Sequence, residues 1–210
     1  MPQKPKYENP LWSILVPTVP GRVSGCFSDL IGKLLDMRGD RNIEILGLFD
    51  NKRRSIGAKR NSLLQIARGD YVSFVDDDDE VDSKYIDRCY DAIVENEGVD
   101  LITFNMLRVD PAGNRLTCKH NRILPEDSGM LEDGSWDGHP THLMLWRRAL
   151  AESFYFPDSS WAEDMDWARA AVRGVLTRFN IDEVLYVYKM NIESIRKAEE
   201  ARSENRMGNS

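Results

Sequence analysis

Four consecutive aspartates, residues 76–79, follow directly on a short apolar run at residues 71–75. Ionised carboxylates this close together repel one another, so the folded protein must place positive charge opposite them. Two carboxylates spaced as Asp76 and Asp78 can share a divalent cation that prefers hard oxygen ligands. Phosphate oxygens can complete the coordination of such a cation. The spacing therefore indicates a metal site that carries a diphosphate.

Two alternatives for the acidic run remain open at this point. One is a solvated acidic turn that caps the following helix. The other is a calcium-binding EF-hand, because Asp76, Asp78 and Glu80 fall at loop positions 1, 3 and 5. Val81 stands where that loop requires glycine, however, and Asp87 stands where it requires glutamate. These departures argue against calcium.

The elements that must position the aspartates alternate along the first half of the chain. Apolar runs typical of buried strands cover residues 12–19, 43–50, 71–75 and 99–107. Helical patterns lie between them, at residues 55–69 and 82–98. This alternation predicts an α/β fold with a mostly parallel sheet and helices on both faces. Such sheets bind ligands at the carboxyl ends of their strands, where the aspartates lie.

The pattern changes after residue 108. A stretch rich in Gly, Asp and Pro, residues 125–140, predicts a long loop, and long loops inside compact domains are usually functional. It is followed by an apolar segment, a helix and a last strand, at residues 142–150, 161–174 and 183–189. The charged tail from residue 192 onward predicts a fraying helix.

Composition sets the class of protein. With 41% hydrophobic and 30% charged residues, the chain is typical of one soluble globular domain. Its net charge of -7 argues against non-specific binding to nucleic acid or anionic membrane. Three scattered cysteines argue against a disulfide framework or a cysteine zinc site. No apolar stretch approaches the ~20 residues of a membrane span, and the N-terminus has no signal-peptide core, so we expect a cytoplasmic enzyme without a transmembrane anchor.

Five segments together resemble a known family. "ILVPTVPGR", "FDN", "GAKRN", "ARGDYVSFVDDDD" and "WAEDMDWARAA" follow, in order and spacing, the pattern of family 2 glycosyltransferases. The resemblance runs from about residue 12 to 190. It implies a GT-A fold with a Rossmann-type nucleotide-binding sheet, forming one domain over residues 1–190. The nucleotide-sugar-binding half would be residues 12–107, the acceptor-binding half residues 108–190, and residues 191–210 a charged tail.

The resemblance also implies a reaction. Family members of the hexosyltransferase type transfer a sugar from a UDP- or dTDP-sugar to a hydroxyl group, with inversion, and use Mn²⁺ or Mg²⁺. Thr18 would line the nucleotide pocket, and Arg22 would contact phosphate. Asp50 would accept the N3–H of uracil or thymine, although a turn-capping role is the alternative. The remaining donor-side and metal-side residues implied by the resemblance are Lys59, Arg60, Asn61, Asp76, Asp78 and Asp79. Asp78 would ligate the metal directly, and Asp76 would contact the ribose and the metal's shell.

The Glu-Asp pair at residues 163 and 164 occupies the position of the family's catalytic base. A carboxylate within ~3 Å of a hydroxyl can take its proton as the glycosidic bond forms. The alternative for Glu163 and Asp164 is a favourable charge at a helix start. On the acceptor side, the resemblance places His139 and His142, and Trp161 would form a stacking wall unless it packs in the core.

The acceptor stays open between a saccharide, a protein, a lipid and, for a phage-type enzyme in the host cytoplasm, a hydroxymethylated base in DNA. The net negative charge weighs against DNA. Other classes of function also remain. A nucleotidyltransferase would release pyrophosphate, and a nucleotide-sugar-binding or calcium-binding module would have no turnover.

Overall fold

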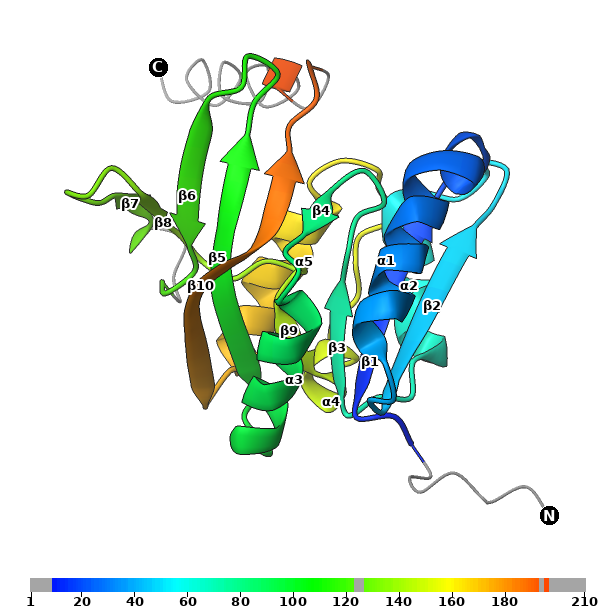
Figure 1. Cartoon of the computed structure of the whole chain (residues 1–210), viewed down its shortest axis with the longest axis horizontal. Coiled ribbons are helices and arrows are strands. Elements are labelled where there is room, and N and C mark those ends of the chain that lie inside the picture. Colours follow the sequence, from blue (N-terminus) through cyan, green and yellow to red (C-terminus); the bar gives the residue numbers. More distant parts are fainter. Residues whose placement is uncertain (1–8, 123–126, 193–194, 197–210) are drawn as a thin grey trace.

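The computed structural model describes residues 9–122, 127–192 and 195–196. A single mixed sheet runs through the molecule, and helices cover both of its faces (Figure 1). Its strands, in the order in which they lie side by side, are β2 (Ile43–Phe49), β1 (Trp12–Thr18), β3 (Tyr71–Phe74), β9 (Leu145–Arg147), β5 (Leu101–Val109), β6 (Arg115–Lys119), β8 (Trp136–Asp137) and β7 (Gly129–Met130). Strand β10 (Arg178–Lys189) pairs with β5 and with the short β4 (Glu80–Val81).

Most paired residues belong to parallel pairs. Strand β1 lies parallel to both β2 and β3, and β10 lies parallel to β5 over nearly its whole length. Every residue of β1 is buried, which explains why it is apolar without alternation. The short antiparallel β9 joins the two parallel parts, because it pairs with β3 on one side and β5 on the other.

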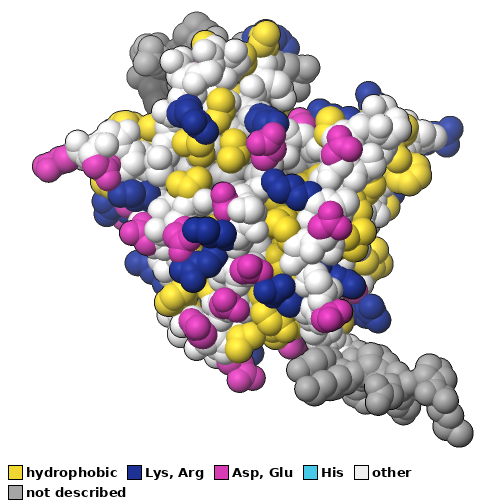
Figure 2. Space-filling model, viewed as in Figure 1, with side chains coloured by type: hydrophobic (Ala, Val, Ile, Leu, Met, Phe, Trp, Pro, Cys, Tyr) yellow, Lys and Arg dark blue, Asp and Glu magenta, His cyan; other side chains and the backbone are white. Residues whose placement is uncertain are grey.

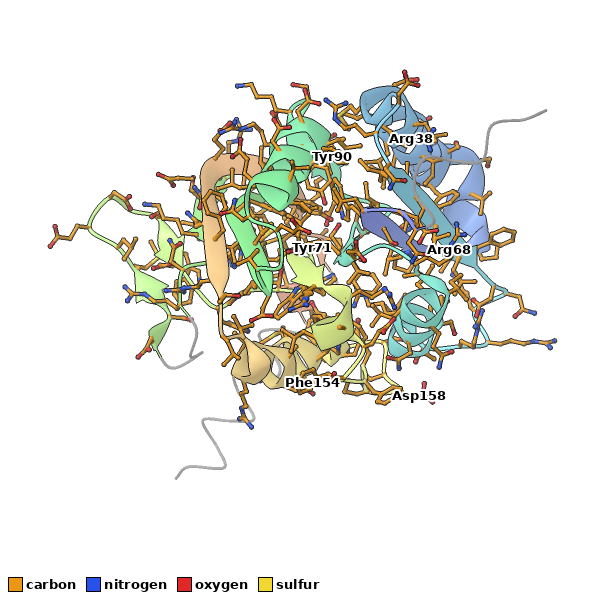
Figure 3. The ribbon with its side chains drawn as sticks, turned by 90° about the horizontal axis from the view of Figure 1, so that it is seen from below. Arg38, Arg68, Tyr71, Tyr90, Phe154 and Asp158 are labelled. Atoms are coloured by element: carbon orange, nitrogen blue, oxygen red, sulfur yellow. The ribbon has the colours of Figure 1, made fainter. Side chains whose placement is uncertain are left out.

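The helices form two layers, as the view from below shows (Figure 3). On one face lie α1 (Ser28–Arg38) and α3 (Tyr85–Glu95), which contact each other. On the other face lie α2 (Ile56–Ile66), α4 (Arg148–Ala151) and α5 (Glu163–Ala171). Short helical turns occur at Pro20–Arg22, Val23–Phe27 and Val172–Gly174. The predicted α/β architecture is confirmed.

Several details differ from the sequence-based expectation. Helix α1 was not predicted, because only Leu30 and Leu34 are buried along its length and its pattern is weak. Strand β10 begins at Arg178, five residues before the predicted start, with its first two residues exposed. The expected loop at 125–140 contains β7 and β8 in its described part. The expected tail helix lies almost entirely outside the described residues.

The surface agrees with the composition. Basic and acidic side chains are interspersed over the face that α1 and α3 cover (Figure 2). No helix in the described part of the chain is both long enough and apolar enough to cross a membrane.

A close approach between α2 and the segment before α5 brings two functional regions together. The N–H of Gly57 donates to the carbonyl of Ser159 at 3.0 Å. A Cβ atom at Gly57 would lie 1.9 Å from the carbonyl oxygen of Pro157, so only glycine allows this packing. Because of it, Arg60 on α2 reaches Glu163 at the start of α5.

Candidate active site

The four aspartates follow β3 and form a turn, which the N–H of Asp79 closes by donating to the carbonyl of Asp76 at 3.2 Å. Asp77 and Asp79 are buried, whereas Asp76 and Asp78 are partly exposed. Asp76, Asp77 and Asp78 line one cavity, whereas Asp79 does not line it.

Asp77 holds the first strand against the acidic turn. Its carboxylate accepts hydrogen bonds from the Thr18 hydroxyl at 2.5 Å and from the Arg22 guanidinium at 2.6 Å. Sequence reasoning assigned no role to Asp77. Thr18 and Arg22 were predicted to face the donor; the structure shows both bound to Asp77, with Thr18 buried and Arg22 lining the adjacent cavity.

Asp78 lies at the cavity edge beside Arg22. The two side chains form an ion pair, with a distance of 3.0 Å between Nη2 of Arg22 and Oδ2 of Asp78. Burial raises the pKa of Asp78, Arg22 opposes the shift, and the charges of Asp76 and Asp77 add to it. The pKa of Asp78 therefore lies above its ordinary value even though Arg22 is paired with it.

Asp79 faces away from the cavity. It accepts hydrogen bonds from the Tyr186 hydroxyl and from the backbone N–H of Lys189, both at 2.8 Å. Burial and the negative charge of Asp76 raise the pKa of Asp79 to about 8. These contacts fix the acidic turn to β10, so Asp79 is placed to support the turn rather than to touch a ligand.

Arg60 joins the acidic turn to the Glu-Asp pair. Its buried guanidinium contacts Asp76 at 2.8 Å and forms an ion pair with Glu163. Burial by itself raises the pKa of Asp76, but Arg60 and His142 outweigh it, and the net pKa lies well below the ordinary value. Burial raises the pKa of Glu163 in spite of Arg60, and the charge of Asp164 adds to that shift.

His142 lies between the turn and the predicted base. Its Nε2 is 3.4 Å from Oδ2 of Asp76, and its Nδ1 is 3.4 Å from Oδ2 of Asp164. The Arg60 guanidinium lies 3.0 Å from the same Nε2. Because a guanidinium can only donate, Nε2 accepts in this contact, and a neutral ring then carries its hydrogen on Nδ1, toward Asp164.

The residues around Asp50 form a separate ionic group. Buried Lys59 pairs with Asp50 at 3.0 Å and donates to the carbonyl of Thr18 at 2.9 Å. Arg54 pairs with the other oxygen of Asp50 at 3.1 Å. Burial opposes the change, yet Lys59 and Arg54 lower the pKa of Asp50 to about 2. Lys59 thus connects the ends of β1 and β2 from inside the protein.

Asn61 and Trp161 occupy different surroundings. The Asn61 amide both donates to the carbonyl of Phe156 and accepts from its N–H, each at 2.9 Å. The structure therefore places Asn61 against the backbone. Trp161 is 40% exposed and lines the same cavity as Arg22 and Asp78. It lies on the donor side, whereas the sequence-based prediction was an acceptor-side wall.

Two cavities meet at the carboxyl edge of the sheet. We call the first, of about 340 Å³, the donor cavity; its lining includes Arg22, Arg60, Asp76, Asp78, Trp161 and Lys189. We call the second, of about 510 Å³, the acceptor cavity; its lining includes Asp76, His120, Trp136, His139, His142 and Asp164. Asp76 and Tyr188 line both cavities and form a shared wall, with Asp78 and Glu163 on the donor side and Asp164 on the acceptor side. A third cavity, of about 470 Å³, lies at the opposite edge of the sheet, and Tyr71 (labelled in Figure 3) is one of its lining residues.

The acidic turn fits a cation held mainly by a bound substrate. The carboxylates at EF-hand positions 1, 3 and 5 point to different partners, namely Arg60, Arg22 and Lys189. Within residues 9–122, 127–192 and 195–196, no cluster of three His, Cys, Asp or Glu side chains could hold a metal alone. This arrangement does not favour the calcium alternative. The carboxylate of Asp78 is 36% exposed at the cavity edge and offers oxygen atoms of the kind that Mn²⁺ and Mg²⁺ prefer.

Comparison with known proteins identifies the family. The model of glycosyl transferase family 2 matches residues 33–154, which is more than half of the chain. The chain therefore belongs to glycosyl transferase family 2. The resemblance to family 2 glycosyltransferases that the sequence motifs indicated is thereby confirmed.

Individual relatives agree with this family. EpsJ, an uncharacterized glycosyltransferase of Bacillus subtilis (strain 168), is 26% identical over 89% of this chain and 63% of its own length. The crystal structure of S. aureus TarS 1-349 in complex with UDP-GlcNAc is 18% identical, with a TM-score of 0.60 over 86% of this chain and 58% of that one. The same protein in complex with UDP gives 18% identity and a TM-score of 0.59 over 89% and 62%. The chain thus spans less than two thirds of each of these proteins, and the structural likeness confirms the GT-A-like fold.

Proposed function

We propose that the chain transfers a sugar from a UDP-sugar, or a dTDP-sugar, to a hydroxyl group, with inversion and with a divalent metal. The observation that carries this proposal is the shared wall between the two cavities. Asp78 lies on the donor side, Asp164 lies on the acceptor side, and Asp76 lines both. A sugar that crosses from one cavity to the other would pass between these carboxylates.

The donor side suits a nucleoside diphosphate. Arg22 and Lys189 line the donor cavity and supply positive charge for phosphate oxygens. Asp78 would hold the metal, and a Mn²⁺ or Mg²⁺ ion bound there would offset the charge of the departing diphosphate. The TarS complexes with UDP and UDP-GlcNAc support a uridine nucleotide as the carrier.

Asp164 is the proposed base. It would take the proton of the acceptor hydroxyl while that oxygen forms a bond to the anomeric carbon, and the bond from that carbon to the diphosphate would break. Attack from the face opposite the leaving group inverts the anomeric configuration. The side chain of Asp164 is 33% exposed, so it is open to an acceptor. Glu163 is tied to Arg60, which gives it a positioning role.

Neighbouring carboxylates on α5 offer a matched test. Asp164→Asn keeps shape and hydrogen bonding but removes the base, so we expect turnover to fall by roughly 10²–10⁴-fold. UDP affinity should stay within about twofold, because the lost interaction belongs to the transition state. Asp166→Asn changes the same residue type two positions further on, where the side chain is 58% exposed, and should retain turnover. Equal turnover of the two variants would contradict the proposal.

A further inference from the structure

All three histidines of the chain line the acceptor cavity, although they are distant in sequence. His120 follows β6, His139 follows β8, and His142 lies before β9. His120 was given no role by sequence reasoning. Their convergence on one cavity is the observation from which a class of acceptor can be inferred.

The protonation of His120 is fixed by its partner. Its Nδ1 lies 2.9 Å from the backbone carbonyl of His139, which can only accept, so Nδ1 carries the hydrogen. Burial lowers the pKa of His120 to about 4, which keeps the ring neutral. Its Nε2 is therefore a buried hydrogen-bond acceptor, and it has no partner among the described residues.

Other buried polar atoms around the cavity also have no hydrogen-bond partner among the described residues. Within the described part of the chain, seven buried side-chain nitrogen or oxygen atoms have no hydrogen-bond partner. Three of them, on His120, Ser128 and His139, belong to residues that line this cavity; a fourth, Nδ1 of His142, lies 3.4 Å from the Asp164 carboxylate. Buried polar groups are almost always paired. A cluster of them around one cavity indicates a ligand with several hydroxyl groups.

The same cavity has an aromatic side chain and two arginines. Trp136, on β8, is 37% exposed, and its ring is available to pack against the apolar face of a sugar. Arg108 has no ion pair with any described residue, and Arg169 has only a loose pair with Asp166 at 3.7 Å. Of the two carboxylates in this lining, Asp76 is paired with Arg60 and Asp164 is the proposed base.

We propose that the acceptor cavity binds a saccharide that carries an anionic substituent, a carboxylate or a phosphate. The ring would pack on Trp136, hydroxyl groups would pair with the unpartnered atoms of His120, Ser128 and His139, and Arg108 and Arg169 would bind the anion. This inference rests on the proposed function, since it names the class of acceptor for the same site. The cavity, at about 510 Å³, is in the range of small-molecule sites.

Saturation-transfer NMR on the whole chain with UDP present can test this. The probes are methyl glucuronide, glucose 6-phosphate and neutral methyl glucoside, each titrated to give a dissociation constant. We expect the two anionic sugars to bind about fivefold or more tightly than the neutral one. Arg169→Gln should remove that preference. Trp136→Ala should weaken all three sugars by about fivefold or more, whereas Tyr155→Ala, an aromatic that is 74% exposed and outside the cavity, should weaken none.

The outcomes of the sugar and UDP titrations test the acceptor assignment and the proposed function separately. Equal binding of anionic and neutral sugars, or unchanged binding in Trp136→Ala, would overturn the inference; Trp136 is exposed enough that its variant should fold. UDP affinity, measured by calorimetry on the same samples, separates this inference from the proposed function. Failure of the wild-type chain to bind UDP would count against the proposed function itself. Binding of UDP but none of the sugars would reject only the acceptor assignment.

Discussion

Arg60 and Glu163 form a buried ion pair, although they lie 103 positions apart in the chain. Both side chains are at most 6% exposed. Because the same guanidinium also holds Asp76, this pair fixes the wall between the donor and acceptor cavities. Its integrity is therefore a condition for the whole site.

Removal of this cation should be costly. Arg60→Met leaves two carboxylates without their partner, and we expect a loss of about 3–5 kcal/mol in the free energy of unfolding. The control Arg88→Met removes a more exposed pair with Glu183 and should cost about 1 kcal/mol or less. Urea denaturation at neutral pH measures both. Similar losses of unfolding free energy in the two variants would contradict the claim that Arg60 fixes the wall between the cavities.

Asp78 should control the metal dependence of donor binding. Asp78→Asn should remove the part of the UDP affinity that depends on Mn²⁺, because the amide is a much weaker ligand. Asp87→Asn, an exposed change on α3, is the control. Calorimetric titrations with and without Mn²⁺ give the comparison. A variant at position 78 that still binds UDP more tightly with Mn²⁺ would exclude Asp78 as the ligand.

Asp79 should make the folded protein less stable as the pH rises from about 4 to about 8. Its pKa is raised from 3.8 to about 8, so its contribution to stability is fully present below the unfolded pKa and is lost as pH rises through the folded one. The window thus runs from about pH 4 to about pH 8. Asp79→Asn stays neutral throughout, so its stability relative to wild type should rise across this window. Parallel pH curves of the melting temperature for both proteins would contradict the assignment.

Asp50 should give a preference between nucleotides. A carboxylate can accept the N3–H of uracil, but cytosine presents an acceptor at the same place, so UDP should bind more tightly than CDP by roughly 1–3 kcal/mol. Calorimetry on the wild-type chain measures this without a variant. We use no variant because Asp50 also forms an ion pair with the buried Lys59, and a substitution at Asp50 would disturb that pair as well as nucleotide binding. Equal affinities would remove Asp50 from the base-binding site.

Much of this architecture could be predicted from local patterns. Apolar runs located the parallel strands, and the position of the acidic run after β3 placed it at the ligand-binding edge. Predictions for individual side chains were harder, because long-range packing decides them. Lys59 was expected to face the nucleotide, yet it is 1% exposed and paired with Asp50 inside the protein. The local sequence does not distinguish a buried Lys59 from an exposed one, because its partner Asp50 is brought close only by the fold.

The acceptor cavity was the least predictable region. His120 and Trp136 lie in a part of the chain with short strands, where neither helical nor strand periodicity extends far enough to show a direction. They reach the cavity only because β6 pairs with β8, a long-range contact. Asp77 was missed for the same reason, because it lies in a turn and its partners Thr18 and Arg22 are distant in the chain.

The central claim is that the chain moves a sugar, with inversion, from a nucleoside diphosphate carrier. The most direct measurement is product analysis after incubation with a UDP-sugar, Mn²⁺ and a saccharide acceptor. Chromatography identifies the nucleotide product, and NMR coupling constants give the anomeric configuration of the new linkage. We predict that UDP is released and that the configuration is opposite to that of the donor. Release of UMP or pyrophosphate, or a retained configuration, would contradict this account.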